Sequence, residues 1–181
     1  AYVGERENRR HKPGRAFERT AYRFDVLGDY GAFRDLQRHR LLTLEWQALS
    51  PRHGWVVGDE IGEVGALDEW ARVMEESGAL HAALAAAGLG AVAPYAVAMA
   101  HRVRYYMELN AREAMHMLEL RTSPQGPPAY RRICQAMHRL IADQAGHGAL
   151  AAAMRYVDHS GGETGRLAAE RASEARRRST S

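Results

Sequence analysis

Cysteine and lysine are almost missing from this chain of 181 residues. Cys134 is the single cysteine, which excludes an intramolecular disulfide and a cysteine-rich zinc site and gives no sign of secretion. Lys12 is the single lysine, and the rest of the 25 basic side chains are arginines. Genome base composition can produce such a bias, so the sequence pI of about 9.2 is a weak indication of nucleic-acid binding.

Long uninterrupted apolar runs are also missing. The longest apolar stretch, residues 79–100, is interrupted by His81, Gly88, Gly90 and Pro94, so no segment reaches membrane-spanning length. The first residues are strongly polar and show no signal-peptide pattern. We therefore expect a cytoplasmic protein without a membrane partner.

Hydrophobic residues make up 46% of the chain, which is enough for a core of one domain. We expect that domain over residues 1–160, followed by a mobile tail over residues 161–181 that is rich in arginine, alanine, glutamate and serine. Strands near the front of the chain and helices behind them predict the α+β class.

Local patterns predict the elements themselves. Alternating apolar residues predict strands at 17–27 and 41–49, and Asp29 is expected to cap a helix that follows the first strand. Apolar residues at helical spacing predict three longer helices, at 67–87, 110–120 and 129–157, with a break in the last near Gly146 or Gly148. The segments 51–65 and 122–128 read as loops, and 94–107 stays open between a helix and a helix followed by a strand. The helix at 67–87 carries its apolar residues on one side: Leu67, Trp70, Val73, Met74, Leu80 and Leu84.

A pattern of chemical interest, N-x-R-x-x-x-H-x-x-x-x-R, lies in the helical segment 110–121. Arg112 and His116 are four residues apart and share a helix face near the helix N-terminus, where an anion is favoured. Arg121 lies about 140° further round the helix, so it need not point at the same group. The alternative is a solvated face, with Arg112 paired to Glu108 or Glu113.

A second cationic cluster, Arg38-His39-Arg40, stands about seventy residues earlier. Arginine is the usual residue for bidentate binding of phosphate or a planar anion, so both clusters indicate a site for a bulky anion. The alternative for this cluster is an interaction with the last carbonyl groups of a helix.

Together the two clusters resemble the flavin-dependent thymidylate synthases. The signature of that family begins with R-H-R, matched by Arg38-His39-Arg40, and continues through a Ser/Thr place and an acidic place, matched by Thr43 and Glu45. It closes with S-x-R, which Ser50-Pro51-Arg52 matches when two extra residues are allowed.

The second element of the family fits the later pattern without a gap, at Asn110, Arg112, His116 and Arg121. The resemblance covers roughly residues 17–141. It implies an antiparallel sheet packed with long helices, and a homotetramer whose active sites combine residues from several subunits. It implies that FAD binds to residues of both clusters: Arg38, His39, Arg40, Asn110, Arg112 and His116. It further implies that the substrate nucleotide is bound by Glu45, Ser50, Arg52 and Arg121.

The implied reaction is methylation at C5 of a uracil nucleotide, dUMP or UMP. Methylenetetrahydrofolate would be the one-carbon donor and NADPH the reductant. Arg121 would be the catalytic residue, because a guanidinium beside the uracil imide stabilises negative charge there and raises the nucleophilicity of C5. The reaction needs no enzyme thiol, which agrees with Cys134 lying in a helical segment, and no metal is expected.

Two departures from the family pattern bear on the nucleotide site. Asp35 stands where the family often has a glutamine, and Pro94 stands where it often has an arginine. They keep open a second interpretation, a domain that binds flavin or nucleotide without turnover. A third interpretation, an unrelated nucleic-acid-binding module, is opposed by the lack of aromatic residues among the basic runs.

Overall fold

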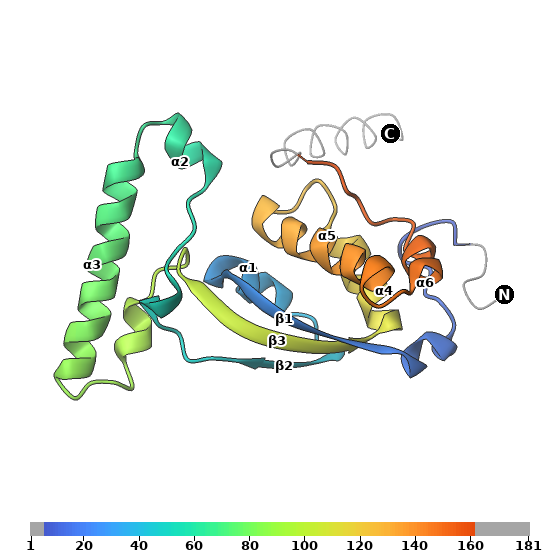
Figure 1. Cartoon of the computed structure of the whole chain (residues 1–181), viewed down its shortest axis with the longest axis horizontal. Helices are drawn as coiled ribbons and strands as arrows, with labels where there is room; N and C mark the ends of the chain where they lie inside the picture. The colour runs from blue at the N-terminus through green and yellow to red at the C-terminus, as the bar shows by residue number, and fades with distance from the viewer. Residues whose placement is uncertain (1–5, 162–181) are drawn as a thin grey trace, which may run out of the picture. The chain divides into compact units, whose positions relative to one another are not determined.

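The computed structural model describes residues 6–161, and its elements confirm the α+β class. Three strands form an antiparallel sheet in the order β1-β3-β2 (Figure 1). Their bounds are Ala21–Asp29 for β1, Leu42–Trp46 for β2 and Arg102–Asn110 for β3. The sequence left the segment 94–107 open, and it forms the short 3₁₀ helix η3, Ala93–Ala96, followed by β3.

The contacts of the chain divide it into two compact units. The described part of the first unit contains residues 6–24, 39–43 and 108–161, and the second contains residues 25–38 and 44–107. All three strands have residues in both units, so the single domain expected over residues 1–160 stays a prediction. The expected mobile tail lies outside the described residues from residue 162 onward.

Strand β1 begins later than the sequence predicted. Residues 15–19 form a 3₁₀ helix, η1 (Arg15–Arg19), which buries Phe17, and the strand starts only at Ala21. From there alternate side chains are buried, as the two-residue period of a strand requires. On the exposed positions, Arg23 pairs with Glu108 within the first unit.

Helix α1, Tyr30–Leu36, follows β1 directly in the second unit. Asp29 accepts a hydrogen bond from the backbone N–H of Ala32 at 2.7 Å, which confirms the predicted cap. Phe33 on this helix is buried, with its ring centroid 4.8 Å from that of Tyr105 on β3.

The segment 51–65 was predicted as a loop, and this was wrong in part. It contains a 3₁₀ turn, η2 (Pro51–His53), and a short helix, α2 (Asp59–Glu63). Pro51 has the φ angle that a helical turn needs at its first position, and the two acids at the start of α2 favour a helix N-terminus.

Helix α3, Leu67–Ala86, confirms the predicted helix to within one residue at its end. Its apolar side is largely exposed: Met74 is buried, whereas Leu67 is 51% exposed and Leu80 is 54% exposed. Within the second unit, α3 packs against η3 and is tied to it by Ser77, whose hydroxyl donates to the Ala96 carbonyl at 2.5 Å.

Three helices complete the first unit. Helix α4, Ala111–Arg121, matches the predicted helix, and helices α5, Pro128–Asp143, and α6, Gly148–Ala153, divide the predicted long helix. The break falls where expected, because Gly146 adopts a φ of 67°, which favours glycine. Helix α5 packs against both α4 and α6 (Figure 1).

Within residues 6–161, no helix combines the length and the apolar character that a bilayer crossing needs. The cytoplasmic location stays a prediction.

Candidate functional site

The site is organised by the turn from β3 into α4 in the first unit. Asn110 ends β3 and caps α4, because its side-chain oxygen accepts from the backbone N–H of Glu113 at 2.9 Å. Asn110 therefore has a structural role of its own. The flavin contact that the resemblance implies for it stays a prediction.

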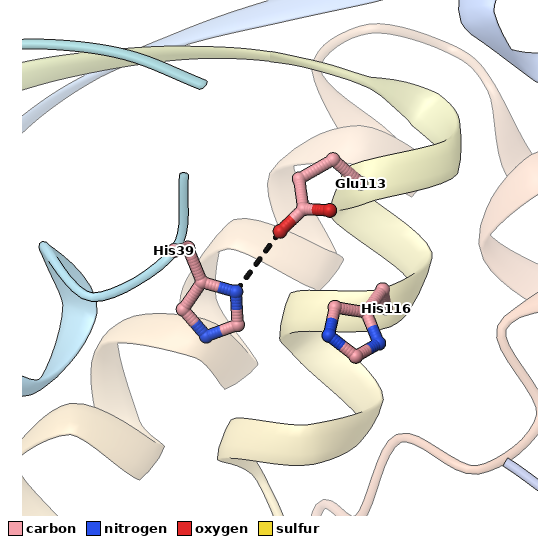
Figure 2. Close-up of side chains that lie close together, drawn as sticks. All are labelled: His39, Glu113 and His116. Atoms are coloured by element: carbon pink, nitrogen blue, oxygen red, sulfur yellow. Dashed lines mark hydrogen bonds and ion pairs between the residues drawn. The ribbon is translucent and has the colours of Figure 1, made fainter. Parts of the chain in front are cut away.

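Glu113 is the partner that the sequence analysis did not identify. Its Oε1 atom lies 2.9 Å from Nδ1 of His39, and both side chains are buried (Figure 2). The residues are 74 positions apart, so this contact joins the R-H-R cluster to α4. The sequence analysis considered Glu113 only as a partner of Arg112, and the N-x-x-E spacing that starts at Asn110 is typical of a helix cap.

Arg121 completes the arrangement on the other side of the His39 ring. Its Nε donates to Nε2 of His39 at 3.0 Å. A guanidinium can only donate, so Nε2 must carry the lone pair and Nδ1 the proton that is shared with Glu113. The two ring nitrogens of His39 therefore bridge the Glu113 carboxylate and the Arg121 guanidinium.

His116 lies one turn beyond Glu113, with its ring centroid 5.7 Å from that of His39 (Figure 2). Although Arg121 and His116 are on different sides of α4, both reach His39. Partial desolvation lowers the pKa of the exposed His116, and the nearby His39, Lys12 and Arg9 lower it further, while Glu113 opposes the shift. The ring is therefore surrounded by more positive than negative charge.

His39, Glu113 and His116 also have ligand types that suit a divalent metal, and their ligand atoms lie within 4.8 Å of one another. The surrounding charges oppose a cation there. Arg121 bonds directly to His39, and Glu113 is the one carboxylate of the group. The chemistry of these donors fits an anionic ligand better.

Arg112 does not pair with Glu108 or Glu113, so the partners that the alternative named were wrong, although Arg112 does form an ion pair. Its Nη1 contacts Glu18 at 3.2 Å and its Nε donates to the carbonyl of Pro13 at 3.1 Å. Glu108 pairs with Arg23 across the sheet instead. Arg112 thus ties the segment before β1 to the first turn of α4.

The remaining residues of the R-H-R cluster are exposed. Arg38 forms an ion pair with Asp35 at 3.4 Å in the second unit, and Arg40 is exposed in the first. Asp35 stands where the family often has a glutamine, and the ion pair with Arg38 offsets part of its negative charge. The flavin contacts that the resemblance implies for Arg38 and Arg40 stay predictions.

The other substrate residues that the resemblance implies lie in the second unit. Arg52 donates to the side-chain oxygen of Gln47 at 2.5 Å, and Glu45 is exposed on β2. The hydroxyl of Ser50 is buried and has no hydrogen-bond partner among residues 6–161. An unsatisfied buried hydroxyl is costly, which fits a group that bonds to a ligand.

Cys134 is not placed or tuned for nucleophilic chemistry. It is fully buried in α5, and burial raises the pKa of its thiol to about 12. A thiol with such a pKa is a poor nucleophile at neutral pH. The sequence interpretation, a reaction without an enzyme thiol, is compatible with this.

Comparison with known proteins gives a family. Residues 6–145 match the family model described as thymidylate synthase complementing protein. The chain is 35% identical to a UPF0159 protein of Chlamydia muridarum over 91% of this chain and 31% of the relative. It is 36% identical to UPF0159 proteins of Chlamydia pneumoniae and Thermoplasma acidophilum, over 91% of this chain and 30% and 33% of those relatives. The chain therefore spans about a third of the length of the curated relatives it matches.

Proposed function

Since the chain belongs to the thymidylate synthase complementing protein family, the flavin-dependent thymidylate synthases, we propose that it methylates C5 of a uracil nucleotide. The proposed substrate is dUMP or UMP, with methylenetetrahydrofolate as one-carbon donor, FAD as cofactor and NADPH as reductant. The observation that carries the proposal is the contact of His39 with both Glu113 and Arg121, which joins the two family motifs in one place.

The residues present fit a flavin nucleotide. FAD carries two phosphates and a planar ring system, and both are bound well by arginine. His116 and Arg40 are exposed in the first unit, and Arg112 lies half-buried on the same helix face as His116. When bound, the flavin supplies the redox chemistry, and the protein supplies orientation and charge.

Arg121 is suited to the proposed catalytic role. Its guanidinium is fixed by the bond to His39 and lies 5.3 Å from the centre of the Tyr130 ring. A fixed positive charge beside the imide of uracil favours the ionised form of the base, which makes C5 a better nucleophile. Because the guanidinium is already oriented, little reorganisation is needed when the base binds.

Self-association is part of the proposal. Large apolar side chains are exposed in and after α3, a pattern that marks interaction surfaces: Leu67, Val73, Leu80, Leu89, Val92 and Tyr95. Their exposure supports the proposed homotetramer with shared sites, in which these side chains would be buried between subunits. Sedimentation of the purified chain tests this, and a monomer at micromolar concentration would contradict it.

An anaerobic assay tests the function. The purified chain is incubated with methylenetetrahydrofolate, NADPH, FAD and either dUMP or UMP, and we expect a C5-methylated product from at least one nucleotide. Arg121→Ala should abolish the product, whereas Arg72→Ala, an exposed arginine paired with Glu76 on α3, should leave the rate unchanged. Absence of product with both nucleotides would refute the proposed turnover.

A second candidate is a domain that binds flavin or nucleotide without turnover. It is favoured by the length of the curated relatives, which leaves room for catalysis to require parts that this chain does not contain. Bound yellow flavin without dUMP-dependent or UMP-dependent NADPH oxidation is the result expected for that candidate.

A further inference from the structure

The N-terminal arm, residues 6–14, lies along one face of α4. Arg112, His116 and Glu119 form this face, because spacings of four and three residues keep them within roughly 60° of one another. The arm is attached at both ends of this face. Arg112 donates to the carbonyl of Pro13 at 3.1 Å, and Arg6 bonds to Glu119 at 2.5 and 2.7 Å. His116 lies between the two attachment points.

The backbone of the arm is fixed around the guanidinium of Arg6. That group donates to the carbonyls of His11 at 2.6 Å and Arg9 at 3.3 Å, and it is 4% exposed. The carbonyl of Arg6 in turn accepts from the hydroxyl of Tyr156 at 2.8 Å. The arm therefore forms a bonded turn whose backbone is held beside α4.

Two cations, Arg9 and Lys12, belong to the part of the arm between its attachments at Glu119 and Arg112, the part that passes His116. Their charges lower the pKa of His116, which agrees with this position. Within residues 6–161, neither side chain forms an ion pair, whereas Glu119 and Glu18 are already engaged by Arg6 and Arg112. An excess of positive charge on a fixed backbone, next to an exposed imidazole, is an arrangement that binds phosphate.

We propose that Arg9, Lys12 and His116 form a subsite for a phosphate group of the nucleotide ligand. The inference rests on the proposed function for the identity of that ligand, which is either FAD through its diphosphate or the uracil nucleotide through its monophosphate. The arm thereby becomes part of the binding site rather than a packing element alone.

Paired ligands and a matched variant test the subsite. Binding of FAD, riboflavin, dUMP and deoxyuridine is measured by titration calorimetry with the full chain and with Arg9→Gln/Lys12→Gln. We expect the double variant to weaken FAD or dUMP binding about 10- to 100-fold while its phosphate-free counterpart changes less than about two-fold. Weaker FAD binding by the double variant assigns the subsite to the flavin phosphates. Weaker dUMP binding assigns it to the nucleotide phosphate.

Arg10→Gln is the control, because Arg10 is exposed on the same arm and is not among the charges that shift the pKa of His116. It removes the same type of charge and should leave all dissociation constants unchanged. Equal weakening by Arg10→Gln, or unchanged binding in the double variant, overturns the subsite. Thermal unfolding of each variant checks that the arm change leaves the fold intact.

Inorganic pyrophosphate separates failure of the subsite from failure of the proposed function. If no flavin and no uracil compound binds, the proposed function fails, yet pyrophosphate binding that is lost in Arg9→Gln/Lys12→Gln but kept in Arg10→Gln still supports the subsite. Absence of pyrophosphate binding in that case overturns both. Micromolar Zn²⁺ binding that is lost in His116→Asn also overturns the subsite, because it would make the cluster a cation site.

Discussion

Arg121 and His39 are joined by a 3.0 Å hydrogen bond between Nε and Nε2, although 82 residues separate them in the chain. Glu113 accepts from the opposite nitrogen of the same ring. The bond orients the guanidinium at the end of α4, and the imidazole can serve both neighbours because its two nitrogens have opposite hydrogen-bonding roles. The effect of changing Arg121 should therefore depend on geometry as well as charge.

Replacing Arg121 should abolish methylation while leaving bound flavin largely intact. We expect Arg121→Ala to lower the rate by about 10²- to 10³-fold, the usual cost of removing one donor to a developing charge. Arg121→Lys should remain strongly impaired, because an ammonium group lacks the Nε donor that meets His39. The rate and the flavin absorbance are measured on the same samples. Loss of flavin together with activity would mean that Arg121 holds the cofactor instead.

Replacing Arg40, alone and together with His39, should lower flavin occupancy. His39→Ala leaves the buried Glu113 without its partner, so this change can also affect the fold. Arg40→Ala keeps that pair and isolates the contact with the ligand. We expect at least about ten-fold weaker flavin binding for each variant, measured by the flavin-to-protein absorbance ratio during dialysis. Unchanged occupancy in Arg40→Ala, as in the exposed control Arg34→Ala, would contradict the proposed contact.

Breaking the buried ion pair between Arg6 and Glu119 should destabilise the first unit strongly. Both side chains are almost fully buried, and hydrogen bonding to Glu119 raises the pKa of Arg6. Arg6→Met leaves an unpaired buried carboxylate, which typically costs about 3–5 kcal/mol. Urea unfolding measures the loss. Arg15→Ala, which breaks an exposed pair with Glu18, should give no measurable change. A small effect of Arg6→Met would show that water reaches Glu119.

Acid should destabilise the second unit through His101. Burial lowers the pKa of this fully buried histidine, with a smaller lowering from His81 and an opposing effect of the Ala98 backbone. Because the folded-state pKa lies below the unfolded value of about 6.5, stability is complete above that pH and falls as the pH drops below it, by at most about 1.4 kcal/mol per pH unit.

The measurement compares urea midpoints of the natural chain and His101→Phe between pH 5 and pH 8. His116 and His159 also have lowered pKa values and contribute to both proteins, so the difference between the two curves isolates His101. Parallel curves would contradict the assignment.

Local rules predicted several elements well. The cap at Asp29, the extent of α3 and the break at Gly146 each depend on residues only a few positions apart, so the pattern of the chain contains the information. The start of β1 was predicted too early because alternation begins at Phe17, yet the packing of η1 against α4 takes Phe17 into a 3₁₀ turn.

By itself, the sequence determined the longer helices, the cap at Asp29 and the two motifs that indicate the family, because each depends on residues close together along the chain. Tertiary structure alone decided which charges meet: His39 with Glu113, Arg6 with Glu119 and Arg112 with Glu18. It also decided that much of the apolar side of α3 is exposed. The reason is physical, since a cap follows from local geometry, whereas a buried ion pair forms only when folding brings distant segments together and removes water from both charges.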